Sequence, residues 1–163
     1  MSANFEIETL PLKYLRPMSN DDLTELMVGE LAAYPYPWTR GNFEDCLSNK
    51  AYSCWVFEQD KKLLGHVVIS IVLTEAHILN ICLYPEYQNK GWGRKLLLET
   101  EAIAKGNGAE SCFLEVRTSN QIGLHLYHSE NYNEVGLRKN YYPTDAGRED
   151  AIVMAKTFYF NDL

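Results

Sequence analysis

The chain has 163 residues, of which 46% are apolar and 23% are charged, and its formal net charge at pH 7 is −7. This length and balance predict one soluble globular domain over residues 1–163 with a single core. The acidic surplus disfavours direct binding to nucleic acid, whose phosphate backbone it repels, and favours a basic protein partner.

The first half of the chain shows capped helices followed by strands. A strand over residues 12–18 precedes a helix over residues 20–34, which Ser19 caps, and a second helix over residues 40–48, which Thr39 caps. Three apolar or alternating strands follow, over residues 51–59, 63–73 and 75–84.

The second half alternates helices and strands. A glycine-rich turn opens a helix that ends near Lys105, and a strand over residues 109–117 leads to a helix over residues 121–130, which Asn120 caps. Two strands, over residues 133–142 and 149–160, follow. The order β-α-α-β-β-β-α-β-α-β-β predicts one α/β domain with helices on both faces of a mixed sheet.

The turn before the third helix is the strongest functional signal. Its sequence, QNKGWGR, places two glycines at a helix N-terminus, where backbone N–H groups bind phosphate. A magnesium-binding P-loop would need Ser or Thr at the position of Leu96, and a dinucleotide-binding turn would need Gly there. The candidate phosphate-binding residues are Gln88, Asn89, Lys90, Gly91, Trp92, Gly93 and Arg94.

The pattern Gln-x-x-Gly-x-Gly in this turn resembles the pyrophosphate loop of the GCN5-related N-acetyltransferases (GNAT). The blocks LEVRTSN, LYHSENYNEVGLRKNYYP and GREDAIVM narrow the resemblance, which covers nearly the whole chain, to the RimI-type ribosomal-protein-alanine N-acetyltransferases. It implies a largely antiparallel twisted sheet and acetyl-CoA as co-substrate. The implied acceptor is the N-terminal alanine of the eighteenth small-subunit ribosomal protein, which attacks directly in a ternary complex. Trp92 departs from the smaller aliphatic residue common in relatives and adds bulk beside the cofactor.

Two residues are candidates for the chemistry. Glu115 lies in an apolar strand, where burial would raise the pKa of its carboxyl group toward a useful value for a general base. Tyr127 could give a proton to the departing thiolate of coenzyme A. The resemblance assigns the matching glutamate and tyrosine these two roles. The alternatives are that Glu115 only pairs with Arg117 or lies on a polar face, and that Tyr127 is a core aromatic residue.

The resemblance also implies how the pantetheine arm is held. The backbone of Ile81, Cys82 and Leu83 would pair with it as with a strand, since a free strand edge accepts any extended chain. Asn120 would reach it as well as cap its helix, although capping alone remains open. A covalent acyl intermediate on Cys82 is disfavoured, because this residue has no basic neighbour in the sequence.

Four residues are candidates for acceptor binding. They are Trp38, Tyr141, Tyr142 and Asp145. The last three lie in a polar, turn-rich loop over residues 139–150, which would form one wall of a peptide groove or a plain hairpin connection. A lysine side chain, a polyamine or an aminoglycoside remains open as acceptor. A non-catalytic acyl-CoA-binding module is a further alternative, although it would need neither Glu115 nor Tyr127.

The cellular setting follows from what the sequence lacks. The apolar run over residues 67–73 is too short to cross a bilayer, and the first residues have no basic or apolar signal region. The cysteines have no metal-binding spacing and are typical of buried thiols in a reducing compartment. We therefore expect a cytoplasmic monomer without a metal and without a membrane partner, and we expect structural or surface roles for the histidines.

Overall fold

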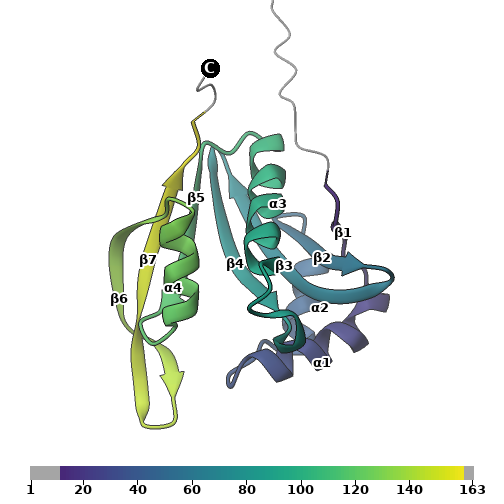
Figure 1. The fold of residues 1–163 in the computed structure, drawn as a ribbon, viewed down its shortest axis with the longest axis horizontal. Helices are drawn as coiled ribbons and strands as arrows, with labels where there is room; N and C mark the ends of the chain where they lie inside the picture. Colours follow the sequence, from purple (N-terminus) through teal and green to yellow (C-terminus); the bar gives the residue numbers. More distant parts are fainter. Residues whose placement is uncertain (1–11, 160–163) are drawn as a thin grey trace, which may run out of the picture.

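The computed structural model describes residues 12–159, and its elements follow the predicted order (Figure 1). They are β1 (Leu15–Pro17), α1 (Leu23–Ala33), α2 (Arg40–Ser48), β2 (Tyr52–Gln59), β3 (Lys62–Val72), β4 (Glu75–Leu83), α3 (Trp92–Gly106), β5 (Ser111–Arg117), α4 (Gln121–Ser129), β6 (Asn133–Thr144) and β7 (Gly147–Thr157). Residues 1–11 and 160–163, which the single-domain prediction includes, lie outside the described part.

The strands of the described part form a sheet in the order β1-β2-β3-β4-β5-β7-β6. Neighbouring strands are antiparallel except β4 and β5, which run parallel. The predicted mixed, largely antiparallel sheet is therefore confirmed. No helix within residues 12–159 has the length and apolar character that a membrane crossing requires.

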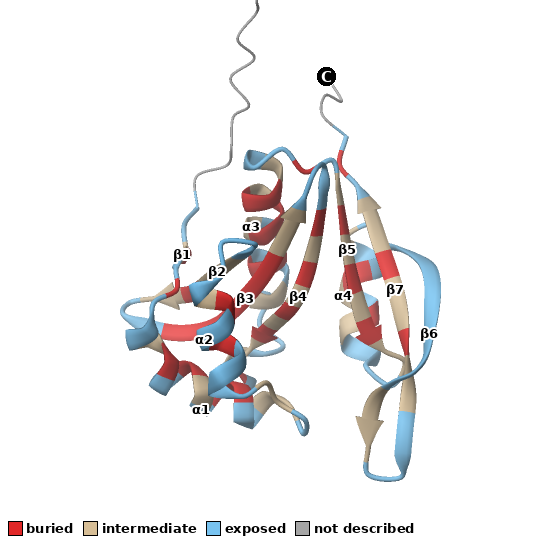
Figure 2. Ribbon diagram, turned by 180° about the vertical axis from the view of Figure 1, so that it is seen from behind, coloured by how far each residue is buried: buried red, intermediate tan, exposed pale blue. Residues whose placement is uncertain are grey.

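Helices cover both faces of this sheet, as predicted. On one face, Leu97 of α3 and Leu124 of α4 share a buried cluster with Leu114 of β5. On the other face, Leu26 of α1 and Phe43 of α2 share a second cluster with residues of β2 to β4. Figure 2 shows that α1 and α2 lie over the β1–β4 half, so the same face of β5 and β7 has no helix over it.

A β-bulge in β4 changes which face its side chains reach. The register with β3 skips Leu79, which lies between Ile78 and Asn80 as the extra residue. Ile78 therefore packs with α3 and α4, whereas Cys82 packs under α1 and α2. The end of β4 presents a different set of side chains to the α1/α2 face than simple alternation would give.

The caps predicted for the first two helices have different outcomes. The Thr39 hydroxyl accepts a hydrogen bond from the Asn42 N–H at 3.2 Å and caps α2, as predicted. The cap predicted at Ser19 is wrong for α1, because residues Asn20–Asp22 form a separate 3-10 turn and α1 starts at Leu23 after Asp22. The N–H of Ser19 donates to the Asp22 carboxylate at 2.8 Å across this turn.

Two predictions of strand length need correction. The strand predicted over residues 12–18 pairs only over Leu15–Pro17. Residues 139–150, for which a hairpin connection was one of the alternatives, form a hairpin with longer strands than predicted, because β6 continues to Thr144 and β7 begins at Gly147. Pro143 is tolerated there because β6 is the edge strand, which does not need every backbone donor.

Candidate functional site

The parallel pair at the centre of the sheet separates after a short ladder. β4 and β5 pair from Glu75 with Ser111 to Ile78 with Leu114. Beyond these pairs the two strands diverge, as Figure 1 shows. The end of β4 thus has an edge without a strand partner, beside the C-terminal end of β5.

Two residues of β4 direct their backbone groups to this open edge. The Tyr84 N–H bonds the Leu64 carbonyl of β3 at 2.8 Å, and directions alternate along a strand, so Cys82 also faces β3. Ile81 and Leu83 face the open edge. Their carbonyl oxygens accept hydrogen bonds from Tyr34 and Gln88 respectively, which leaves the two N–H groups directed outward.

The predicted phosphate loop connects β4 to α3. Asn89 and Gly91 have φ values of 61° and 86°, and α3 begins at Trp92, so its first turn includes Gly93 and Arg94. The backbone N–H groups at this helix start have no partner within α3, which is the arrangement by which helix N-termini bind anions.

The side chains of the loop mostly contact protein. Gln88 donates to the Leu83 carbonyl at 2.9 Å, and Arg94 pairs at 2.9 Å with Glu130, which follows the last residue of α4. Lys90 is exposed. The Trp92 ring packs edge-on against Tyr14 at 5.1 Å between ring centroids, toward β1. The loop is thus held in shape by its own side chains.

Glu115, the candidate base, lies on β5 with its side chain 9% exposed. Its carboxylate bonds His77 Nε2 at 2.6 Å and lies 3.4 Å from Arg138 Nε. The alternative pairing with Arg117 is wrong, because Arg117 pairs with Glu149 at 2.8 Å. The Glu115 carboxylate is thus held in place through both of its oxygens.

Tyr127, the candidate acid, lies on α4 against the opposite face of β5. It shares a buried cluster with Leu114 and Val116, whose side chains alternate with that of Glu115. Burial raises the pKa of Tyr127, so the hydroxyl keeps its proton at neutral pH. Among residues 12–159 this hydroxyl has no hydrogen-bond partner, so its proton is available to a ligand.

Asn120 caps α4 as predicted. Its side-chain oxygen accepts from the Gly123 N–H at 2.9 Å. A Cβ at Gly123 would lie 2.7 Å from the Asn120 amide nitrogen, so a larger residue at this third helical position would force the Asn120 side chain to shift. The cap fixes the start of the helix that carries Tyr127.

The α1–α2 connection reaches across to the β6–β7 hairpin. The Tyr36 hydroxyl donates a hydrogen bond to the Asp145 carboxylate at the hairpin turn. Arg117 lies between the rings of Tyr36 and Tyr142, at 5.4 and 4.5 Å from their centroids. The structure therefore brings Asp145 and Tyr142 together with Tyr36, a residue that the sequence did not single out.

The two remaining acceptor candidates are placed differently. Trp38 packs its ring on Phe43 at 5.3 Å and turns its backbone N–H to the Glu30 carboxylate, at 3.1 Å. Tyr141 is 45% exposed and lies edge-on to Tyr142 at 4.9 Å. Trp38 is thus packed against the buried cluster of α1 and α2, while Tyr141 lies on the exposed surface of the hairpin.

Residues 20–131 match the sequence model of the acetyltransferase (GNAT) family. The chain belongs to this family. The ribosomal protein bS18-alanine N-acetyltransferase of Escherichia coli (strain K12) is 38% identical over 126 residues, which are 77% of this chain and 84% of that protein. These matches confirm the resemblance predicted from the motifs.

Solved structures of GNAT proteins share the fold. The crystal structure of the ribosomal-protein-S18-alanine N-acetyltransferase from Escherichia coli superposes with a TM-score of 0.81 and 34% identity, over 91% of this chain and 97% of that one. Arabidopsis thaliana NAA60 in complex with acetyl-CoA gives a TM-score of 0.78 at 17% identity, over 88% and 97% of the two chains. At 17% identity, the similarity to NAA60 shows a shared fold only.

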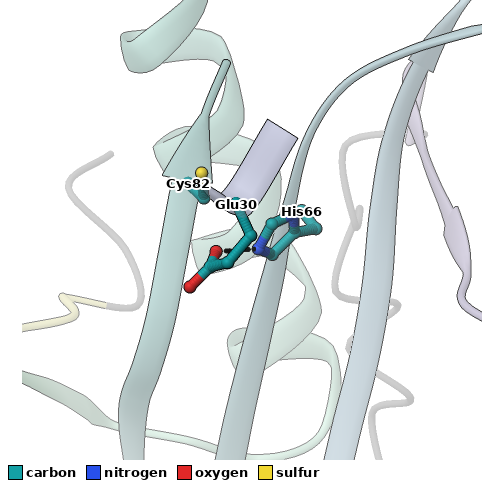
Figure 3. A group of neighbouring side chains, drawn as sticks. All are labelled: Glu30, His66 and Cys82. Carbon is teal, nitrogen blue, oxygen red and sulfur yellow. Dashed lines mark hydrogen bonds and ion pairs between the residues drawn. The ribbon is translucent and has the colours of Figure 1, made fainter. Parts of the chain in front are cut away.

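A buried polar network lies beside the GNAT site and was not predicted. Glu30 bonds His66 Nε2 at 2.8 Å and Asn80 Nδ2 at 3.1 Å, and His66 Nδ1 bonds the Tyr84 hydroxyl at 2.9 Å. Figure 3 shows Glu30 of α1 directed toward His66 of β3, with Cys82 of β4 beside them. The network ties α1 to the two strands that precede the phosphate loop.

Glu30, His66 and Cys82 also offer metal-ligand atoms that lie within 4.8 Å of one another. Hydrogen bonds from His66, Asn80 and the Trp38 backbone already occupy the Glu30 carboxylate, while the Asn80 side-chain oxygen is buried without a partner among the described residues. Burial and the nearby Glu30 raise the pKa of the Cys82 thiol. Cys82 is therefore a poor nucleophile in this GNAT chain, which supports direct transfer over an acyl-cysteine step.

Proposed function

We propose that this GNAT protein transfers the acetyl group of acetyl-CoA to the α-amine of an N-terminal alanine, in a ribosomal protein of the bS18 type. The Escherichia coli relative is named for this reaction. The observation that carries the proposal is the arrangement of Glu115 and Tyr127 on opposite faces of β5, beside the open edge of β4.

The chain offers a place for the co-substrate. The N–H groups of Ile81 and Leu83 would bond the pantetheine arm along the open edge of β4, with Asn120 close to the same arm. The turn from Gln88 to Arg94 and the start of α3 would hold the diphosphate. Acetyl-CoA supplies an activated acetyl thioester when bound.

The two catalytic residues then move protons. Glu115 accepts a proton from the acceptor amine, whose nitrogen lone pair forms the new bond to the acetyl carbon. Tyr127 donates its hydroxyl proton to the departing sulfur. Because the side chains lie on opposite faces of β5, acceptor and coenzyme would approach the reacting carbon from different sides of the sheet.

An α-amine suits a carboxylate base better than a lysine does. The α-amino pKa is ~8 and the lysine pKa is ~10.4, a difference worth about 3.3 kcal/mol of deprotonation. The hairpin and the α1–α2 connection, with Tyr36, Trp38, Tyr141, Tyr142 and Asp145, would form the walls that receive the N-terminal segment.

The free thiols of all the cysteines fit a reducing cytoplasm, where we place the enzyme.

The test compares two basic peptides that both begin with alanine, one with a free and one with a blocked N-terminus. Mass spectrometry should find one acetyl group on the free peptide and none on the blocked one, although both keep their lysines. Glu115→Gln should abolish most of the turnover while calorimetry still detects acetyl-CoA binding. Equal acetylation of both peptides would assign the activity to lysine instead.

A further inference from the structure

His77 contacts the candidate base directly and has no place in the function described so far. It lies on β4 opposite Phe113 of β5, and Glu115 is the next residue of β5 on that face. His77 and Glu115 are therefore diagonal neighbours across the parallel pair, and their side chains meet at 2.6 Å. This contact orients the carboxylate through one of its two oxygens.

The two side chains differ in their access to solvent. Glu115 is 9% exposed, whereas His77 is 35% exposed. His77 lines a pocket of about 240 Å³. The pocket lies on the same sheet face as α1 and α2, in the part of that face that no helix covers (Figure 2). Glu75, Glu115 and Arg138 are the other charged residues of this pocket, while β3 contributes Ser70 and Val72.

A base in this position has to lose its proton after every turnover. In the proposed reaction, Glu115 receives one proton from each acceptor amine. The Glu115 carboxyl group lines the same pocket but is only 9% exposed, whereas the bonded imidazole is 35% exposed and offers the proton a wider route to solvent.

We propose that His77 is a positioning residue for Glu115 and passes the acceptor's proton from that carboxyl group to solvent. The inference rests on the proposed role of Glu115 as base. The geometry that carries it is the 2.6 Å contact together with the exposure of His77, 35% against 9% for Glu115, to the pocket that both side chains line.

The proton balance is complete without a further reactant. At rest, neutral His77 holds its proton on Nε2, which donates to the Glu115 carboxylate. Once Glu115 has taken the amine's proton, the exposed ring exchanges with water to the Nδ1–H tautomer, and Glu115 gives its proton to the freed Nε2. Loss of the Nδ1 proton to water in the pocket then restores the Nε2–H tautomer and the carboxylate. One proton has moved from the amine to solvent, and both side chains are back in their first state.

The experiment compares His77→Gln with a matched control, His128→Gln. Glutamine keeps an N–H donor for Glu115 and removes the titrating ring. His128 is also bonded to a carboxylate, that of Glu134 at 3.3 Å, but it is 50% exposed and lies away from the pocket. Turnover on the alanine peptide is measured in weak and in concentrated buffer, with and without added imidazole, across pH 6 to 9.

We expect His77→Gln to lower kcat by about ten-fold or more in weak buffer, with KM for the peptide nearly unchanged. Imidazole or concentrated buffer should restore much of the rate, because a small base in the pocket can take the proton. The His128→Gln control should match the wild type under every condition.

Three outcomes separate the claims. If His77→Gln is as fast as the wild type in weak buffer, or is slow but insensitive to added base, the proton-transfer role of His77 is overturned. If the wild type acetylates the peptide but Glu115→Gln does so equally well, Glu115 is not the base and the inference falls with it. If the wild type acetylates no N-terminus, the proposed function itself has failed.

Discussion

Glu115 and Tyr127 lie on opposite faces of one strand, β5, next to the part of β4 that has no partner. A base and an acid on the same face would compete for one reactant. In the proposed reaction, their separation by the thickness of the sheet would give each its own reactant, the amine on the α1/α2 face and the thiol on the α3/α4 face. The functional predictions below follow from this division.

Tyr127→Phe should reduce kcat by about two orders of magnitude or more, since only the proton for the leaving sulfur is lost. The Tyr127 hydroxyl has no partner among the described residues, so its removal should leave thermal stability near that of the wild type. Calorimetry should show acetyl-CoA affinity within a few-fold. An unchanged kcat would mean that water protonates the thiolate.

Gly93→Ala tests the phosphate loop without disturbing the fold. A Cβ at Gly93 would lie 3.5 Å from Leu126, an ordinary contact, so the variant should melt like the wild type. It should nevertheless bind coenzyme A more weakly, because the added methyl group crowds the diphosphate. Gly91→Ala is the contrasting variant, since its φ of 86° predicts a loss of stability as well. Full affinity in folded Gly93→Ala would remove the turn from the site.

Tyr36→Phe removes the bond between the α1–α2 connection and the hairpin while keeping the ring over Arg117. The peptide should bind less tightly, because the wall that receives it becomes mobile, and acetyl-CoA binding should not change. Steady-state kinetics should therefore show a higher peptide KM with an unaltered acetyl-CoA KM. Asp145→Asn should have the same effect as Tyr36→Phe. A rise in the KM values of both the peptide and acetyl-CoA would contradict a role of this contact in peptide binding alone.

Glu30→Ala should lower the free energy of unfolding by about 3–5 kcal/mol, because it leaves several buried donors without an acceptor. Glu44→Ala is the control, since Glu44 forms an exposed pair with Arg40 and its loss should cost less than about 1 kcal/mol. Chemical denaturation measures both. A small effect at Glu30 would show that the network relaxes or fills with water.

Stability should also depend on pH through Asp22. Hydrogen bonding to the Arg16 guanidinium holds the pKa of Asp22 below its usual value of about 3.9. The folded state therefore binds this proton less readily than the unfolded state, and the stabilisation is present above about pH 4 and is lost as the pH falls further. Asp22→Asn should flatten this part of the curve, and an unchanged slope between pH 5 and 2 would refute the assignment.

Local signals predicted much of the fold. The alternation of apolar and polar residues, the helix-capping residues and the glycines at turns indicated the elements in their observed order. The Gln88–Gly93 motif and the blocks that follow it were enough to indicate the family. The same blocks marked Glu115 and Tyr127, since both residues lie within them. Strand ends were predicted wrongly where the long β6–β7 hairpin continues its pairing through a turn-rich sequence, as at Pro143.

The remaining site residues depend on pairings that no local pattern reveals. His77 meets Glu115 only because β4 and β5 are parallel and in one particular register. Tyr36 meets Asp145, and Glu30 meets His66, through folding that joins distant segments. The bulge at Leu79 also decides which face Asn80 and Cys82 occupy, and the alternating sequence gives no sign of it.

The short ladder between β4 and β5 has a consequence for how long the protein survives in the cell. Two halves of the sheet meet through a few backbone pairs, and a pantetheine arm along the open edge would add the contacts that a missing strand leaves out. A ligand at one hundred times its dissociation constant stabilises the folded state by about 2.7 kcal/mol. Resistance to unfolding and proteolysis would thus rise and fall with the supply of acetyl-CoA, so that a starved cell would hold less of this enzyme without any change in its synthesis.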